Sequence, residues 1–304
     1  MKSRLVGTLL ATCLLTLSPQ DSVAQTTLYG GIGRGGGPNS GWLIKIDQGT
    51  GAGTLVGLPD SVSGLTGLGF DISGALYGTT ISGQLSPTGP SGRTSTLVRI
   101  DPNTGAQLGP AVSITSAGVP IAITDLAVQP GTERLYGNLL DETTFTNSIY
   151  VIDPTTGVAT LVGNTGVIGA TIAFGPDGTL YQTSAIFDQN GFVAGFLDTL
   201  DPNDGHILTT SAAFTLSHVG GLAVNPTNGV IFASGGANNN VYTLSPTGTQ
   251  TLVGSTVVGG PGDLAFTPLP TSRDQCQNDG WRRFKFPFTF KNQGDCIQLV
   301  NTGK

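Results

Sequence analysis

The stretch Ile152-Asp153-Pro154-Thr155-Thr156-Gly157 decides the fold, because versions of it return along the whole chain. Copies of this aliphatic-Asp-Pro-x-x-Gly turn, spaced roughly 45 to 60 residues apart, begin at Ile46, Ile100, Ile152, Leu200 and Leu244. A fixed period of this length, made of short apolar runs and tight turns, is typical of small sheets that pack on one another, since no single unit can bury its own faces.

Each repeat contains four short segments that fit strands. The first is a run of small and apolar residues such as 170–174, and it ends in a tight turn such as 175–178, whose Pro and Gly set the backbone dihedrals. An apolar-aromatic pair such as Leu180-Tyr181 starts the second strand, and runs such as 148–152 and 160–162 supply the third and fourth. Four antiparallel strands repeated around an axis predict an all-β, five-bladed β-propeller. An open solenoid or a sandwich is the alternative.

The two ends of the repeat array complete each other. The array opens at the second strand of a unit, at Leu28, and closes with an isolated first strand over 261–266. We therefore predict that these two segments share one blade, which would hide the sheet edges that an open array leaves exposed.

Composition supports an all-β chain with three parts. It is 38% apolar and only 11% charged, and its 47 Gly and 18 Pro would interrupt long helices. Lys2 and Arg4, an apolar run over 5–17 and the triplet Ser22-Val23-Ala24 predict a signal peptide over 1–24, with a lipoprotein signal at Cys13 as the alternative. We expect the propeller over 25–270 and a small tail over 271–304, in a protein that is secreted or periplasmic, with association with the cell surface as a further option.

Charge and cysteine separate the tail from the body. Residues 25–270 carry five Lys or Arg and fifteen Asp or Glu, whereas residues 271–304 carry six and three. An acidic body argues against nucleic acid as its partner, because phosphate binding needs a basic surface. Cys276 and Cys296 are the cysteines that remain after processing, and in an exported chain such a pair predicts a disulfide. Two thiols without a nearby His cannot complete a zinc site. No transmembrane segment is expected, and we expect a monomer.

The repeats resemble those of known proteins. The segment 172–181, together with runs like 150–157, resembles the repeats of exported bacterial propellers, including NHL-like and quinoprotein-like families. This resemblance covers about 240 residues and implies the fold, but it does not imply a function, because propellers host binding and catalysis alike. The segments 276–282 and 290–296 resemble a short C-terminal motif that follows varied repeats in exported bacterial proteins.

The long loops between second and third strands are the predicted recognition surface. They are variable in length, they belong to one face of the propeller, and variable loops on a rigid scaffold usually carry recognition. The candidate binding residues on this face are Arg34, Asn39, Arg93, Asp141, Glu142, Asp188, Asn190 and Asn239. Solvent-exposed loop residues without a function are the alternative for each of them. The ligand expected here is an unidentified glycan, small molecule or surface protein.

Two acidic residues occupy equivalent places on predicted central strands. Asp125 and Asp263 each precede a Leu on a predicted central strand, which would turn their carboxylates toward the central channel. They are therefore candidate ligands for a cation such as calcium. The matching residues elsewhere are Gly67, Thr171 and Gly221, so no full ring of carboxylates forms, and a hydrogen bond between blades is the alternative. No other cofactor is expected.

Catalytic patterns are sparse. Glycoside hydrolysis needs two placed carboxyl groups, yet the only Glu residues are Glu133 in a turn and Glu142 in a loop. Of the two histidines, His218 precedes a central strand and is the better candidate base. Gly31-Ile32-Gly33-Arg34-Gly35-Gly36 matches the dinucleotide fingerprint, but no helix follows it. We therefore predict a non-catalytic binding or surface-interaction module, with a secreted polysaccharide hydrolase or lyase as the alternative.

Overall fold

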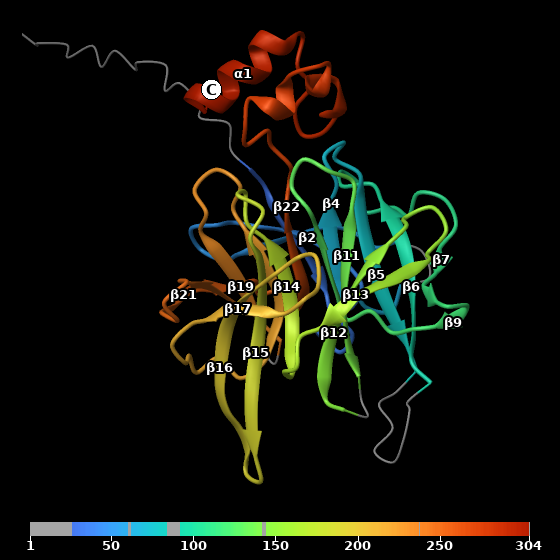
Figure 1. The fold of residues 1–304 in the computed structure, drawn as a ribbon, viewed down its shortest axis with the longest axis vertical. Coiled ribbons are helices and arrows are strands. Elements are labelled where there is room, and N and C mark those ends of the chain that lie inside the picture. Colours follow the sequence, from blue (N-terminus) through green and yellow to red (C-terminus); the bar gives the residue numbers. More distant parts are fainter. Residues whose placement is uncertain (1–25, 60–61, 84–91, 142–143, 237, 304) are drawn as a thin grey trace, which may run out of the picture.

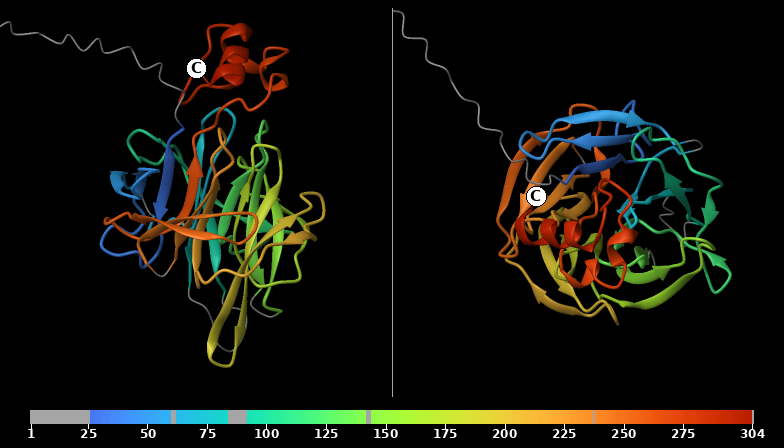
Figure 2. Two further views of the ribbon diagram at one scale, coloured as in Figure 1. Left: turned by 90° about the vertical axis from the view of Figure 1, so that its left-hand side faces the viewer. Right: turned by 90° about the horizontal axis from the view of Figure 1, so that it is seen from above.

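The protein is a five-bladed β-propeller. The computed structural model describes residues 26–59, 62–83, 92–141, 144–236 and 238–303, so the predicted signal peptide lies outside the described residues. Five antiparallel sheets of four strands each surround a common axis (Figures 1 and 2). This arrangement confirms the fold predicted from the repeats and excludes the alternatives, an open solenoid or a sandwich.

The blades contain the following strands, given from the axis outward. Blade 1 is β22 (Pro261–Phe266), β1 (Leu28–Ile32), β2 (Leu43–Ile46) and β3 (Gly53–Gly57). Blade 2 is β4 (Gly67–Phe70), β5 (Leu76–Ser82), β6 (Thr94–Ile100) and β7 (Val112–Ser113). Blade 3 is β10 (Asp125–Val128), β11 (Leu135–Asp141), β12 (Thr146–Ile152) and β13 (Ala159–Asn164). Blade 4 is β14 (Gly169–Phe174), β15 (Leu180–Asp188), β16 (Gly191–Leu200) and β17 (Ile207–Thr210), and blade 5 is β18 (Val219–Val224), β19 (Ile231–Gly235), β20 (Asn240–Leu244) and β21 (Gln250–Ser255). A two-stranded sheet, β8 (Thr115–Ser116) and β9 (Val119–Pro120), links blades 2 and 3.

The ring is closed by strands from the two ends of the repeat array. β1 pairs antiparallel with β22, with Leu28 opposite Phe266 and Gly30 opposite Leu264. The last described strand of the array therefore supplies the inner strand of blade 1, as the sequence predicted.

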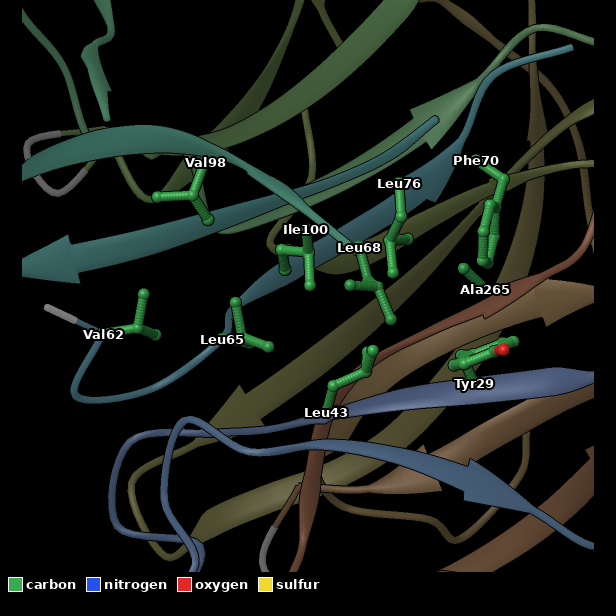
Figure 3. Packing of buried hydrophobic residues seen from close by; sticks show 10 residues of the cluster. All are labelled: Tyr29, Leu43, Val62, Leu65, Leu68, Phe70, Leu76, Val98, Ile100 and Ala265. Carbon is green, nitrogen blue, oxygen red and sulfur yellow. The ribbon is translucent and has the colours of Figure 1, made fainter. Parts of the chain in front are cut away.

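The core lies between neighbouring blades. At the boundary of blades 1 and 2, Tyr29, Leu43 and Leu65 pack with Leu68 and Ile100, and all five are almost fully buried (Figure 3). Aromatic rings recur at these boundaries in edge-to-face pairs, namely Tyr29 with Phe70, Tyr136 with Phe174 and Phe232 with Phe266. Such pairs add roughly 0.5–1.5 kcal/mol each beyond the area they bury. The repeat therefore fixes the packing of blade on blade.

The Asp-Pro-x-x-Gly turns are structural. In blade 3, Asp153 Oδ1 accepts hydrogen bonds from the backbone amides of Thr155 at 2.7 Å and Thr156 at 3.2 Å. The turn ends in Gly157, whose φ of 72° lies in the left-handed region that favours glycine. The other four copies end in glycines of the same conformation, Gly51, Gly105, Gly205 and Gly248.

The tail forms a small unit that lies over one face of the propeller (Figure 2). It contains the 3-10 helices η1 (Asp274–Cys276) and η2 (Gly280–Arg283) and the helix α1 (Gln293–Thr302), and Cys276 is bonded to Cys296. Phe286 stacks on Phe70, and Arg283 Nη1 donates to the carbonyl oxygen of Gly131 at 3.1 Å. The tail thus packs against turns that join first to second strands. The predicted disulfide is confirmed and is compatible with an extracellular or periplasmic compartment.

Candidate functional site

The tail covers one end of the propeller axis. At that end the inner strands surround an apolar cavity of about 120 Å³, whose lining includes Leu68, Leu126, Ile172 and Leu222. Phe284 of the tail and Leu269 of the segment that leads into it complete the lining. The tail therefore contributes to the wall of this cavity, whereas the other end of the axis is formed by loops of the blades alone.

The opposite end carries the loops between second and third strands. A hollow of about 540 Å³ opens there, lined by Arg34 from the β1–β2 loop, Arg93 from the β5–β6 loop, Thr66 and a series of glycines. Arg34 Nη1 donates to the carbonyl oxygen of Gly83 at 2.6 Å, which ties the loop of blade 1 to that of blade 2. We call this hollow the mouth. Two arginines among its lining residues give it a local positive charge, which suits an anionic group.

A second hollow of about 360 Å³ adjoins the mouth. It shares Gly35, Gly36, Gly236 and Gly260 with the mouth and adds the amide side chains of Asn39, Asn238 and Asn239. Asn39 Nδ2 donates to the Val258 carbonyl oxygen at 2.7 Å, so this loop is held against blade 5. We call this hollow the amide shelf. Amide side chains offer both donors and acceptors, which suits hydroxyl groups.

The structure divides the predicted binding residues into two groups. Arg34 and Arg93 line the mouth, and Asn39 and Asn239 line the amide shelf, because blades 1, 2 and 5 are neighbours. The remaining candidates belong to blades 3 and 4 and line neither hollow: Asp141 ends β11, and Asp188 and Asn190 form the β15–β16 turn, where Asp188 Oδ1 accepts from the Asn190 amide at 2.7 Å. Glu142 lies outside the described residues.

The candidate cation ligands lie on the axis itself. Asp125 and Asp263 are both fully buried. Asp125 Oδ2 accepts from the Ile172 amide of the next blade at 2.5 Å, and Asp263 Oδ2 accepts from the Leu68 amide of the blade that follows it. These are hydrogen bonds between blades, the alternative that the sequence left open for this pair. The calcium hypothesis stays a prediction.

Burial dominates the electrostatics of this pair. Burial raises the pKa of Asp125 well above its usual range, and the charge of Asp263 raises the pKa further. Burial also raises the pKa of Asp263, to about 7, while hydrogen bonds from Asp125 and from backbone amides act to lower it. Removing a carboxylate from water disfavours its charged form, which explains why both pKa values move upward.

The residues considered for catalysis do not meet in one pocket. Asp263 is fully buried on the axis, whereas His218 is exposed and Asp141 and Asp188 sit on separate blades. His206 Nδ1 lies 2.5 Å from Asp204 Oδ1 in an exposed turn, close to Asp201. Hydrogen bonds from His206 lower the pKa of Asp204. None of these three residues lines the mouth.

Sequence reasoning missed the glycines of the mouth and the buried polar groups of blade 4. Gly220, Gly236, Gly260 and Gly262 line the mouth with backbone atoms, and their only signal in the sequence is the density of glycine near the start of each inner strand. In blade 4, Gln182 and Asp198 are opposite each other across β15 and β16 and are both buried. Polar residues in a strand usually face solvent, so nothing in the sequence indicates that these two side chains are buried.

Comparison with known proteins shows resemblance at the level of solved structures. No known family's sequence profile matches the chain, and no curated protein matches it. A chain of the nidogen/laminin complex superposes with a TM-score of 0.49 at 12% identity, over 80% of this chain and 98% of that chain. A gluconolactonase from Xanthomonas campestris gives 0.43 at 16% identity, over 79% of this chain and 80% of that chain. The PQQ-bound aldose sugar dehydrogenase from Streptomyces coelicolor gives 0.44 at 14% identity, over 74% and 79%. Likeness at this level says nothing about activity, and the propeller assignment follows from the strand pairing above.

Among the described residues, no helix is long and apolar enough to cross a membrane.

Proposed function

We propose that this protein is an exported binding module whose mouth holds the acidic group of a ligand, with an acidic glycan as the ligand class. The observation that carries this proposal is the placement of positive charge. Residues 25–270 contain five Lys or Arg against fifteen Asp or Glu, yet two of the five, Arg34 and Arg93, line the mouth. In an acidic body, such a local pair is a site where a carboxylate or sulfate is favoured over the rest of the surface.

The geometry suits a saccharide. The mouth, at about 540 Å³, falls within the range of roughly 300–1,000 Å³ that is usual for small-molecule sites. Arg34 is exposed, and of the five N–H donors of a guanidinium its described contacts occupy only the one that binds Gly83. The adjoining amide shelf presents Asn39, Asn238 and Asn239, which can pair with the hydroxyl groups of a neighbouring sugar.

Binding without catalysis fits the side chains that are present. Among the described residues that line the mouth and the amide shelf, none is an Asp, a Glu or a His. Hydrolysis of a glycosidic bond needs a carboxylic acid and a carboxylate on either side of the bond, and general acid or base catalysis needs a titratable group within reach. The proposal of a polysaccharide hydrolase or lyase therefore has no support from these two hollows.

The test compares an acidic oligosaccharide with its neutral form. Isothermal titration of the purified mature chain with trigalacturonate should show binding that weakens as salt is raised, and fully methyl-esterified trigalacturonate should bind at least tenfold more weakly. Arg34→Gln and Arg93→Gln should each reduce affinity about tenfold or more, because a hydrogen bond to a charged group contributes roughly 1.5–3 kcal/mol. Arg99→Gln, on the exposed outer part of blade 2, is the matched control and should bind like the parent protein. Equal affinity for acid and ester, or equal losses in all three variants, would refute the proposal.

A further inference from the structure

One layer of residues closes the axis between the mouth and the apolar cavity. Each inner strand contributes one residue, and the five are Gly67, Asp125, Thr171, Gly221 and Asp263. The residues just before this layer, Thr66, Gly220 and Gly262, line the mouth. The residues just after it, including Leu68 and Leu264, line the apolar cavity. Two carboxyl groups are therefore enclosed at the centre of the ring.

The two carboxyl groups reach each other across blade 2. β4 lies between β22 and β10, and its residue in the layer is Gly67. A Cβ atom on Gly67 would lie 2.9 Å from the Leu126 amide nitrogen, so the space beside that amide is open only because position 67 lacks a side chain. Each of the two carboxyl groups acts on the pKa of the other, which places Asp125 and Asp263 next to each other, and the Leu126 amide acts on both.

The hydrogen bonds around the pair are unequal. Asp263 accepts from the backbone amides of Leu68 and, at 2.6 Å, Leu264, so both of its oxygens face N–H donors. Asp125 Oδ2 accepts from the Ile172 amide, but Asp125 Oδ1 is buried and has no hydrogen-bond partner. An oxygen in that position is satisfied if it carries a proton and donates it to the neighbouring carboxylate.

We propose that Asp125 stays protonated and donates from Oδ1 to an ionised Asp263, so that one proton joins blades 1 and 3 across Gly67 and closes the centre of the ring. When that proton is released to solvent, two buried carboxylates face each other and the layer loses its hydrogen bond. The ring then loosens directly beneath the mouth, since Gly262 of the mouth precedes Asp263. The propeller thus contains a proton-dependent closure that is separate from the proposed ligand site.

A proton explains the pair better than a metal ion does. Calcium takes six to eight oxygen ligands, whereas here backbone N–H groups occupy Asp263 and one oxygen of Asp125. Strands packed against the pair place neutral residues beside it: Gly31 on β1, Gly67 on β4, Thr79 on β5, Asn138 on β11, Thr171 on β14 and Gly221 on β18. Among the residues that the structure describes, Asp263 is the single charged group whose charge acts on Asp125.

The pH dependence has a definite sign. Both pKa values are raised in the folded protein, so between the ordinary value near 3.8 and the folded values the folded protein binds more protons than the unfolded chain. The contribution of the pair to stability is therefore complete below the ordinary value, and it falls as pH rises through about 7 for Asp263 and through the raised pKa of Asp125.

Two measurements on the full mature chain test the proposal. Infrared difference spectra with 13C-labelled Asp should show a protonated carboxyl at neutral pH, and Asp125→Asn should abolish this band. Thermal unfolding from about pH 5 to about pH 9 should show a fall in Tm for the parent protein that exceeds the fall in Asp125→Asn by about 3 °C or more, because the Asn amide keeps a donor toward Asp263 without a proton to lose. Asp71→Asn is the matched control, since Asp71 is also buried but accepts hydrogen bonds from Ser73 and Ala75 in a turn of blade 2, and this variant should keep both the band and the parent's pH profile.

Three results would contradict a proton shared between Asp125 and Asp263. If the parent protein shows no protonated carboxyl at neutral pH, the proposal is wrong, and this readout stands even if a variant does not fold. A pH profile of Asp125→Asn that matches the parent's would also refute it. Calcium or EDTA added to the parent protein and to Asp125→Asn separates a metal from a proton: a rise in Tm with calcium that is lost in the variant would replace the shared proton with a metal site.

Discussion

A single glycine shows how closely neighbouring blades meet. A Cβ atom on Gly57, at the end of β3 in blade 1, would overlap the carbonyl oxygen of Thr104 in the Asp-Pro-x-x-Gly turn of blade 2. The same overlap would occur for Gly163 with Asp204 and for Gly254 with Thr50. The outer strand of one blade and the turn of the next therefore form one recurrent contact, in which the strand residue must lack a side chain.

Gly57→Ala should destabilise the propeller by about 1–3 kcal/mol, because an added methyl group in a closed contact forces the backbone of the neighbouring turn to move. Urea denaturation of the full chain measures the change. Gly49→Ala is the control: its Cβ would meet only Asp47 Oδ1 at 3.5 Å, so it should change stability by less than about 0.5 kcal/mol. Similar losses in the two variants would show that the contact with Thr104 is unimportant.

At the scale of elements, a disulfide and side-chain packing hold the tail together, and a hydrogen bond and a ring contact attach it to the propeller. Its own core consists of Ile72 from the propeller with Cys276, Phe284 and Cys296. Outside this core, Arg283 bonds Gly131 and Phe286 stacks on Phe70, so the tail is tied to blades 2 and 3. Ile72 is the propeller residue in this core, whereas the blades pack on one another through separate clusters, so the two units should respond separately to loss of the disulfide.

Replacing both cysteines by serine should loosen the tail and leave the propeller folded. A disulfide that closes a loop of 20 residues contributes about 3 kcal/mol in the chain-entropy estimate, which is comparable to the stability that so small a unit can reach. Limited proteolysis followed by mass spectrometry should show cleavage within 273–303 at a protease concentration that leaves the parent protein intact. Unfolding of the propeller, followed by circular dichroism, should be nearly unchanged. Resistance of the tail to cleavage in this variant would contradict the expectation.

How far the sequence predicts the molecule differs between these elements. The repeats predicted the blades and the ring closure, and the pair of cysteines in the tail predicted the disulfide, because each depends on patterns that recur or pair. The grouping of the candidate binding residues followed only in part: Arg34, Asn39, Arg93 and Asn239 gather because blades 1, 2 and 5 are neighbours, but the same loop pattern on blades 3 and 4 put Asp141 and Asp188 elsewhere. The meeting of Asp125 with Asp263 could not be foreseen, because it depends on the absence of a side chain at Gly67 on the strand between them. Nor does any pattern in the tail indicate which turns it contacts.

At the scale of the whole molecule, β22 is the element that makes a ring out of an array. It pairs with β1, supplies Asp263 to the central layer and places Leu264, Ala265 and Phe266 in the core, where each is at most 9% exposed. Burying a Leu and a Phe contributes roughly 3–6 kcal/mol together, a large share of the 5–15 kcal/mol that stabilises a typical domain. Without β22, the inner edge of β1 and the flank of β4 would both face solvent.

Truncation separates the role of β22 from that of the tail. A chain that ends at Gly260 lacks both, and we expect it to lose cooperative unfolding and to aggregate, because blade 1 would have an open inner edge and the ring an unfilled gap. A chain that ends at Thr271 lacks only the tail, keeps the pairing of Leu28 with Phe266, and should unfold cooperatively. Differential scanning calorimetry of the two chains beside the parent protein gives the comparison. Cooperative unfolding of the shorter chain near the parent's Tm would mean that the ring does not depend on the β1–β22 pairing, because four complete blades and an open sheet would then be enough.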